Sequence, residues 1–290
     1  MSQYWTYISE WQSSSGRTPP DGILFAVGDI HGRLDLLTAM QRTIRQQMAL
    51  SVAATRSVIY LGDYIDRGRN SLEVLRTLAK GMGDTGVNEH YLLGNHDLGL
   101  QHLLEMEFGD NELLLIWFEY GGKNTLERMG VPWPGYFASK DMFGEYQQKV
   151  RAVLGAEVVR FLECLPAFHQ NGDYLFVHAG IDPNRGGSID QQDFADLLLM
   201  REPFLSWPSP WPFPFCVVHG HTPARPTVRA HRIGVDTGAF YTDTLTAAQF
   251  EGTQVRFVSV STRRTCDWLE SLPDNGWRNT YGPPQRIEKE

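Results

Sequence analysis

Short apolar runs alternate with amphipathic segments along the first third of the chain. Apolar runs at 23–27, 58–61 and 91–93 are each followed by a polar turn and then by apolar residues at helical spacing. The clearest amphipathic segments predict helices over 34–48 and 71–80. Buried strands that alternate with helices are typical of a parallel sheet, which binds ligands just beyond the carboxyl ends of its strands.

The later part of the chain carries two other patterns. Residues 98–170 show several helical patterns and few strand signals, so we interpret them as a helical insertion. Five apolar runs then follow in quick succession and predict a second, more meander-like sheet. These runs are 174–177, 215–218, 232–235, 244–250 and 254–260. The expected fold class is α/β, a two-sheet β-sandwich flanked by helices.

The two ends of the chain differ from this regular pattern. Residues 1–22 contain a serine run and the pair Pro19–Pro20, which predicts a flexible leader. Residues 262–290 are polar and predict a loosely packed C-terminal tail. The domain itself is expected to span residues 23–261.

Composition narrows the possible partners and compartments. A formal net charge of −8 disfavours binding of a nucleic-acid polymer through a basic surface. The first residues lack a basic start and an apolar segment, which predicts no signal peptide, and the longest apolar run, 113–118, is too short for a membrane span. Three widely spaced cysteines, without a CxxC pair, suit a reducing compartment. We therefore expect a cytoplasmic protein whose oligomeric state stays open.

Five segments share one design, in which an apolar strand leads into a glycine-flanked turn that carries Asp, Asn or His. They read GDIHG (28–32), GDYIDRG (62–68), GNHD (94–97), HAG (178–180) and GHT (220–222). Glycine allows the sharp turn and the close approach of the backbone to a ligand. Carboxylate, amide and imidazole groups are suitable ligands for divalent transition metals. One such segment is often only a turn, but five in order at strand ends indicate a metal site.

The spacing suggests how two ions could be shared among these turns. Asp29 and His31 are two residues apart at one strand end and could reach one ion, whereas Asp63 ends the next strand and could bridge two ions. The ligands of the second ion would be Asn95, His178 and His221. Two cations roughly 3.5–4 Å apart need a shared anionic ligand, because they repel each other.

These segments resemble the metallophosphoesterase superfamily, and specifically its phosphoprotein phosphatase branch of bacterial type. GDYIDRG matches the GDxVDRG motif of that branch. The likeness runs from about 23 to 250 and includes YGGKNTLERMG (120–130) and LLLMREPF (197–204).

The resemblance implies a role for each matching residue. It implies metal ligation by Asp29, His31, Asp63, Asn95, His178 and His221. It makes His96 the general acid, oriented by Asp66, which would protonate the leaving oxygen. Phosphate oxygens would be held by Arg67, Asn95 and Arg201, the last through a looser match. Two divalent ions are implied, with manganese as the first choice and iron or zinc as alternatives.

The favoured function at this point is hydrolysis of phosphomonoesters, such as phosphoserine or phosphothreonine of proteins, by direct attack of metal-bound hydroxide. The third segment reads GNHD, whereas GNHE is common among protein phosphatases, and GNHD also occurs in dinucleoside tetraphosphate hydrolases of the superfamily. Hydrolysis of such a phosphoanhydride is therefore the alternative. The alternative of another class is an inactive metal-binding scaffold.

Several polar or aromatic residues have plainer interpretations. His219 competes with His221, which we favour because it lies beyond the glycine at the strand end. Asp97 is expected to cap a helix, and Asp236 to shape a turn. The aromatic and proline-rich stretch 207–215 is either a rigid loop or part of a substrate groove. Packed or surface positions are expected for His90, His102, His169 and His231.

Overall fold

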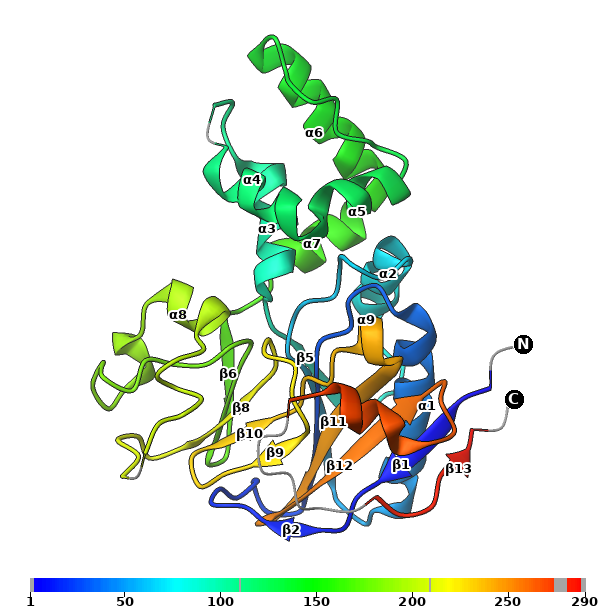
Figure 1. Ribbon diagram of the computed structural model, residues 1–290, viewed down its shortest axis with the longest axis vertical. Helices are drawn as coiled ribbons and strands as arrows, with labels where there is room; N and C mark the ends of the chain where they lie inside the picture. Colours follow the sequence, from blue (N-terminus) through cyan, green and yellow to red (C-terminus); the bar gives the residue numbers. More distant parts are fainter. Residues whose placement is uncertain (1–2, 110, 209, 274–280, 288–290) are drawn as a thin grey trace.

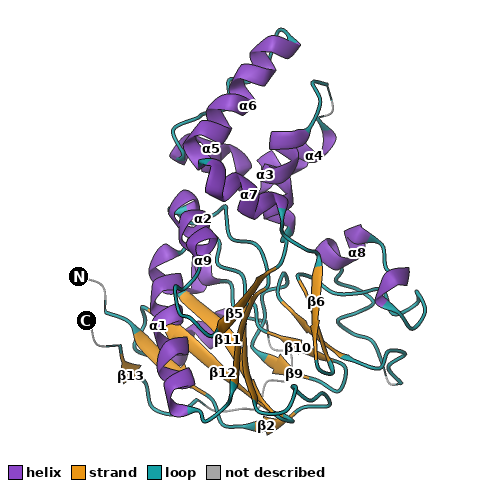
Figure 2. Ribbon diagram, turned by 180° about the vertical axis from the view of Figure 1, so that it is seen from behind, coloured by secondary structure: helices purple, strands orange, loops and turns teal. Residues whose placement is uncertain are grey.

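The computed structural model describes residues 3–109, 111–208, 210–273 and 281–287. Two β-sheets lie face to face at its centre, and helices cover the outside (Figures 1 and 2). A lobe of helices stands above one edge of the sheets. This arrangement confirms the α/β two-sheet fold predicted from the sequence.

The first sheet combines parallel and antiparallel strands. Its order is β13-β1-β12-β11-β3-β4-β5, with β2 paired to β12. The strands are β1 (Trp5–Ile8), β2 (Gln12–Ser13), β3 (Gly22–Val27), β4 (Thr55–Tyr60), β5 (Val87–Tyr91), β11 (Thr244–Glu251), β12 (Gln254–Ser261) and β13 (Gln285–Arg286). Strands β3, β4 and β5 run parallel, so their carboxyl ends meet at one edge.

The second sheet has the order β6-β7-β8-β10-β9. Its strands are β6 (Phe168–Asn171), β7 (Tyr174–Val177), β8 (Cys216–His219), β9 (Thr227–Val228) and β10 (Arg232–Gly234). The prediction of a meander over 174–260 is wrong in two respects. Strands β7, β8 and β10 pair in parallel, and the hairpin β11–β12 joins the first sheet beside β3. Apolar runs show that a strand is buried, but backbone pairing between distant segments decides its sheet.

Most of the helices lie outside the sheets or in the lobe. The helices are α1 (Leu34–Leu50), α2 (Ser71–Lys80), α3 (Asn95–Glu105), α4 (Glu112–Trp117), α5 (Lys123–Arg128), α6 (Lys140–Leu154), α7 (Ala156–Glu163), α8 (Phe194–Leu199) and α9 (Ala239–Thr242), with a π-helical turn at Phe118–Gly122 and 3-10 turns at Ile189–Gln191 and Cys266–Ser271. Helix α1 packs on β11 and β12, and α3 to α7 build the lobe. None of the helices in the described residues is long and apolar enough to cross a bilayer.

Both faces of the central strands are buried, which explains their unbroken apolar sequences. In β3, Phe25 belongs to the core beneath the helices, whereas Leu24 and Ala26 belong to the core between the sheets. Val58 and Ile59 of β4 divide in the same way. Successive side chains of a strand point to opposite faces, so a strand covered on both sides needs apolar residues at every position.

The two ends of the chain are more ordered than the sequence suggested. The expected flexible leader supplies β1 and β2, and Tyr7 is fully buried with its hydroxyl donating to the carbonyl of Arg263. In the expected loose tail, Trp268 is fully buried and its ring meets that of Tyr281. Strand β1 pairs with β12, and β13 pairs with the other side of β1. The two segments therefore extend the first sheet beyond β12, whose edge would otherwise be exposed. Residues 274–280 and 288–290 of the tail lie outside the described part.

Candidate active site

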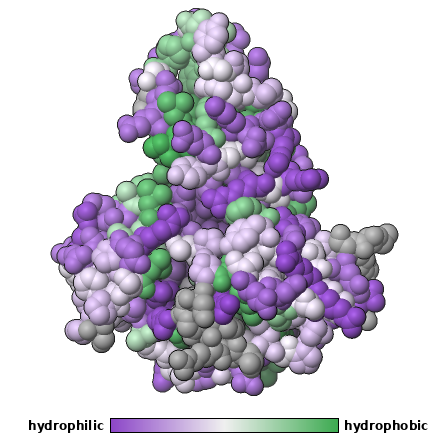
Figure 3. All heavy atoms as spheres, in the orientation of Figure 1, coloured by the Kyte–Doolittle hydropathy of each residue, from purple (hydrophilic) through white to green (hydrophobic). Residues whose placement is uncertain are grey.

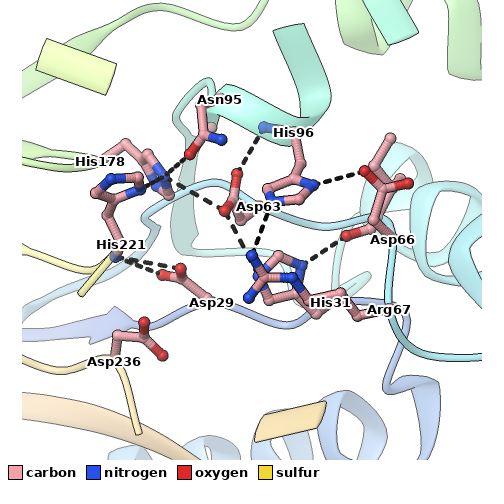
Figure 4. Close-up of polar contacts among 12 residues, drawn as sticks. Asp29, His31, Asp63, Asp66, Arg67, Asn95, His96, His178, His221 and Asp236 are labelled. Carbon is pink, nitrogen blue, oxygen red and sulfur yellow. Dashed lines mark hydrogen bonds and ion pairs between the residues drawn. The ribbon is translucent and has the colours of Figure 1, made fainter. Parts of the chain in front are cut away.

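The polar turns from both sheets meet at one edge of the sandwich (Figure 4). Asp29 follows β3, Asp63 follows β4, and Asn95 begins α3 just after β5. From the second sheet, His178 follows β7 and His221 follows β8. The site therefore forms where the parallel strands of both sheets end, as expected for ligand sites in such sheets.

The backbone of these turns is held in an unfavourable conformation. His31, Asp63, Asp66, Arg67 and His221 have φ values of 46°, 53°, 69°, 62° and 63°, in the left-handed region. Residues with a side chain rarely adopt this region, and such positions concentrate at functional sites. The left-handed backbone turns these five side chains into or beneath one pocket. A regular extended strand would not point them there.

Two glycines are required by the closeness of the turns. A side-chain carbon at Gly94 would collide with the backbone and carboxylate of Asp63, and one at Gly220 would collide with the carboxylate of Asp29. Any larger residue at either position would therefore displace a carboxylate of the site.

Asp63 is the residue that two candidate metal groups share. One group comprises His31, Asp63 and His96, and the other comprises Asp63, His178 and His221, with all potential ligand atoms of each group within 4.8 Å of one another. Asp63 Oδ2 lies 3.5 Å from Nε2 of His31 and 3.4 Å from Nε2 of His178. Burial by itself raises the pKa of Asp63, but the nearby imidazoles outweigh it and hold that pKa well below its usual value.

The imidazoles of His31 and His178 are each fixed by a backbone carbonyl. Nδ1 of His31 lies 2.7 Å from the carbonyl oxygen of Ile65, and Nδ1 of His178 lies 2.8 Å from that of Leu61. A carbonyl only accepts, so each Nδ1 carries the proton and, in a neutral ring, Nε2 keeps its lone pair. Metal-binding histidines are commonly oriented in this way.

Polar atoms converge around Nε2 of His178. Asn95 Oδ1 lies 3.0 Å from it and Nδ1 of His221 lies 3.2 Å from it, in addition to the Asp63 oxygen. Among the described residues, Nε2 of His221 is buried without a hydrogen-bond partner. Lone pairs that face one another in a dry site repel unless a proton or cation lies between them. This donor set fits divalent metal ions.

Asp29 lies beside these groups, next to a second buried carboxylate. Both of its oxygens are 3.1 Å from the backbone nitrogen of His221, and Asp236 lies near it (Figure 4). Burial, followed by the charge of Asp236, raises the pKa of Asp29 well above its usual value. A cation at this place would offset the repulsion between the two carboxylates. Asp236 also accepts a hydrogen bond of 2.8 Å from the amide of Gly238, which confirms its predicted role in a turn.

His96 and Asp66 form a buried pair at the opposite side of the pocket. Nδ1 of His96 lies 2.6 Å from Oδ2 of Asp66, and the His96 amide donates to Asp63 Oδ1 at 2.9 Å. Burial lowers the pKa of His96, but Asp63 and Asp66 outweigh it and raise this pKa above its usual value. The geometry suits an imidazole that is oriented by a carboxylate and holds a proton.

Two residues that support Asp66 were missed by the sequence reasoning. Trp117 donates its indole N–H to Oδ2 of Asp66 at 2.7 Å, and the hydroxyl of Thr125 donates to Oδ1. They are 51 and 59 residues away from Asp66 in the chain. Thr125 lies within the YGGKNTLERMG segment, so the resemblance marked its position without assigning it a role.

We expect Thr125→Val to lower the free energy of unfolding by about 1–3 kcal/mol, because the fully buried Asp66 carboxylate loses a donor. Urea unfolding followed by circular dichroism measures this change. Thr38→Val is the matched control, since the exposed Thr38 donates only to a carbonyl of its own helix. Equal stability losses in both variants would show that Asp66 does not depend on Thr125.

Arg67 and Arg201 line the pocket together with the histidines. The pocket has a volume of about 240 Å³, and its lining includes both arginines, Asn95, His96 and His221. Nη2 of Arg67 lies 3.2 Å from Nε2 of His96, and the guanidinium lies 4.7 Å from the ring centre of Phe240. Arg67 thus faces the pocket, and among the described contacts it makes no ion pair with Asp66. The structure thus brings the residues that the sequence singled out, from the first motif to the last, together at one site.

The plainer interpretations of neighbouring residues can also be compared with the structure. Asp97 is a helix cap as predicted, since its carboxylate accepts from the amides of Tyr64 and Gly94. His219 turns away from the pocket toward Arg232, 3.3 Å from its Nη1. The strand ends between His219 and His221, and the left-handed backbone of His221 redirects its side chain to the metal group.

The stretch 207–215 behaves as a packed loop over its described residues. Phe213 and Phe215 stack on each other and belong, with Trp211 packed against them, to an apolar cluster behind the second sheet. The described lining of the pocket does not include them. It also omits the four histidines expected at plain positions, namely His90, His102, His169 and His231.

Comparison with known proteins gives concordant results. The sequence model of the calcineurin-like phosphoesterase family matches residues 24–253. A relative from Bacillus velezensis, named as the asymmetrical bis(5'-nucleosyl)-tetraphosphatase PrpE, is 24% identical over 266 residues, which cover 86% of this chain and 97% of the relative. A symmetrical bis(5'-nucleosyl)-tetraphosphatase from Methylococcus capsulatus is 29% identical over 160 residues, or 55% of this chain and 44% of that protein.

A similar solved structure is described as a provisionally assigned diadenosine tetraphosphatase. It superimposes with a TM-score of 0.53 at 22% sequence identity and covers 83% of this chain and 96% of its own. This likeness concerns the fold.

Proposed function

This chain belongs to the calcineurin-like phosphoesterase family, and from this premise we propose that it is a metal-dependent hydrolase of dinucleoside tetraphosphates. The observation that supports this substrate is the relative named as a tetraphosphatase, which aligns over 97% of its length. The sequence alone favoured phosphomonoesters of proteins, and the relatives support the alternative instead. A cytoplasmic location stays a prediction.

The proposed ligands divide between two ions around the shared carboxylate. Asp29 and His31 would hold one ion, Asn95, His178 and His221 would hold the other, and Asp63 would contact both. When bound, two such ions lower the pKa of a water molecule and neutralise charge on the phosphate oxygens. Manganese is our first choice, with iron or zinc as alternatives, because His, Asp and Asn suit several divalent metals.

The protein's own residues perform the remaining steps. His96, held by Asp66, donates a proton from Nε2 to the oxygen that leaves phosphorus. General acid catalysis of this kind contributes roughly 10²–10⁴-fold to the rate. Nε2 of His96 lies toward Arg67 in the pocket, so a phosphate bound by Arg67 would place its leaving oxygen beside the acid.

Arg67 and Arg201 hold the phosphate oxygens that do not react. Guanidinium groups match phosphate oxygens in geometry and stay charged at all working pH values. Their placement in one lining with Asn95 and His96 orients the reacting phosphorus toward the metal groups.

A substrate panel tests the proposal. The manganese-loaded protein is expected to hydrolyse diadenosine tetraphosphate with a kcat/KM at least about tenfold above that for phosphoserine and phosphothreonine peptides at equal concentrations, because the relatives are named for the dinucleotide. Phosphate release and nucleotide chromatography measure both reactions, and metal analysis of the same sample gives the ion content.

The other outcomes of the panel assign the alternatives. A preference for the phosphopeptides would restore the protein phosphatase favoured by the DRG motif at 66–68. Failure to hydrolyse every substrate, including 4-nitrophenyl phosphate, would indicate an inactive metal-binding scaffold.

A further inference from the structure

Three large apolar side chains line the otherwise polar pocket. Ile116, Tyr120 and Leu199 are 49%, 60% and 55% exposed, and all three border the same cavity as Arg67 and His96. Phosphate binding gives no reason for them, because it requires charged and polar groups. Single exposed apolar residues are common on proteins, but a group that converges on a catalytic pocket indicates a binding surface.

The three residues come from two segments of the chain on opposite sides of the pocket. Ile116 lies on α4 and Tyr120 on the π-helical turn that continues it, whereas Leu199 ends α8. Figure 1 shows α4 in the lobe and α8 beside the second sheet, and Figure 3 shows hydrophobic surface on the side of the lobe that faces α8. Because all three residues line one pocket, a flat apolar group bound there would contact both segments.

The backbone of the π-helical turn explains why Tyr120 lies at the pocket. Gly121 has φ 130° and ψ −11°, which interrupts the helical path, and a side-chain carbon on it would lie 3.2 Å from Cβ of Asp66. The chain thus needs a glycine to pass close to Asp66, and the residue before it projects into the pocket. Irregular π-helical turns are frequent at functional sites.

The contacts of the same helix locate this surface on the leaving-group side. Trp117, the neighbour of Ile116, donates to Asp66, which in turn binds His96. The apolar surface therefore borders the proposed general acid, which acts on the departing oxygen.

We propose that Ile116, Tyr120 and Leu199 form a subsite that holds the nucleobase of the departing nucleotide, with the base stacked on the Tyr120 ring. Aromatic rings bind bases of any sequence through their flat faces, and the aliphatic side chains of Ile116 and Leu199 exclude water around them. The choice of a nucleobase rests on the proposed function.

The test compares two inhibitors that differ only in the nucleoside. Adenosine 5'-triphosphate and inorganic tripolyphosphate compete against 4-nitrophenyl phosphate with the manganese-loaded protein, and each inhibition constant is measured from initial rates. The unchanged protein should bind the nucleotide about tenfold more tightly than tripolyphosphate, which is the order of effect of one base stacked on one ring. Tyr120→Ala should abolish this preference, whereas Tyr120→Phe, which keeps the ring, should retain it.

Tyr136→Ala is the matched control, because Tyr136 is a 74% exposed tyrosine that lies after α5 and outside the pocket lining. Thermal unfolding of each variant confirms that it is folded. Absence of a nucleotide preference in the unchanged protein, or a preference that survives Tyr120→Ala, would overturn the subsite. Tighter competition by a phosphopeptide than by the nucleotide, lost in Tyr120→Ala, would assign the surface to a protein substrate instead. Failure of the proposed function shows separately, as absent hydrolysis of diadenosine tetraphosphate.

Discussion

Asp63→Asn is expected to lose both metal ions and to lower kcat/KM by more than about 100-fold. Loss of a residue that only orients a metal ligand already costs up to about 100-fold, and Asp63 is proposed as a ligand itself. Asp63 uses both oxygens. Oδ1 accepts the amide of His96 at 2.9 Å, and Oδ2 faces the imidazoles of His31 and His178. Asparagine offers a single oxygen and no charge, so it cannot serve the backbone contact and two cations together.

Metal content per chain after desalting, measured by mass spectrometry, reports this loss directly. Asp84→Asn makes the same chemical change at a distant surface position, where Asp84 pairs with Arg45 at 2.6 Å, and should keep both ions. Retention of two ions per chain by Asp63→Asn would rule out a bridging role. Loss of one ion alone would mean that Asp63 serves a single site.

His96→Ala is expected to keep both ions and to lose turnover unevenly. For an alkyl phosphomonoester, whose alkoxide is a poor leaving group, kcat should fall by roughly 10²–10⁴-fold, because the departing oxygen must then leave without a proton. For 4-nitrophenyl phosphate, whose leaving group is already stable as an anion, the loss should be much smaller. The comparison of the two losses isolates proton donation from substrate binding.

The structure gives this experiment a second use. His96 is close enough to His31 and Asp63 to share a metal group with them, although its Nδ1 is engaged with Asp66. Loss of an ion from His96→Ala would therefore identify His96 as a ligand, and equal losses on both leaving groups would contradict its role as an acid. His102→Ala, on the same helix and outside the pocket lining, is the matched control.

The five motifs could be recognised from the sequence alone, because each depends on residues that are neighbours in the chain. Each glycine turn follows an apolar run, so residues such as Asp29 and His221 could be placed at strand ends before any coordinates. The left-handed backbone at His31 and Asp63 is instead supported by contacts between the turns, since the amide of His31 donates to the carbonyl of Asp63 at 2.9 Å. The strand pattern likewise predicted the two-sheet fold, because a strand that is buried on both faces has an almost continuous apolar sequence.

Contacts between distant segments had no such local signature. The sequence placed β11 and β12 in the wrong sheet, since any buried strand can pair with another through its backbone. It treated the leader as loose, although Tyr7 packs against Tyr281 from the far end of the chain.

The sequence by itself determined which side chains stand at the strand ends and that their chemistry suits divalent metals and phosphate. Only the tertiary structure decided that Asp63 is shared by two groups, that Trp117 and Thr125 hold Asp66, and that apolar residues of two separate helices border the pocket. The reason is physical. An apolar run that ends in a glycine turn is a local feature of the sequence, whereas the surroundings of a buried group are fixed by whichever segments the packing of the whole chain brings against it.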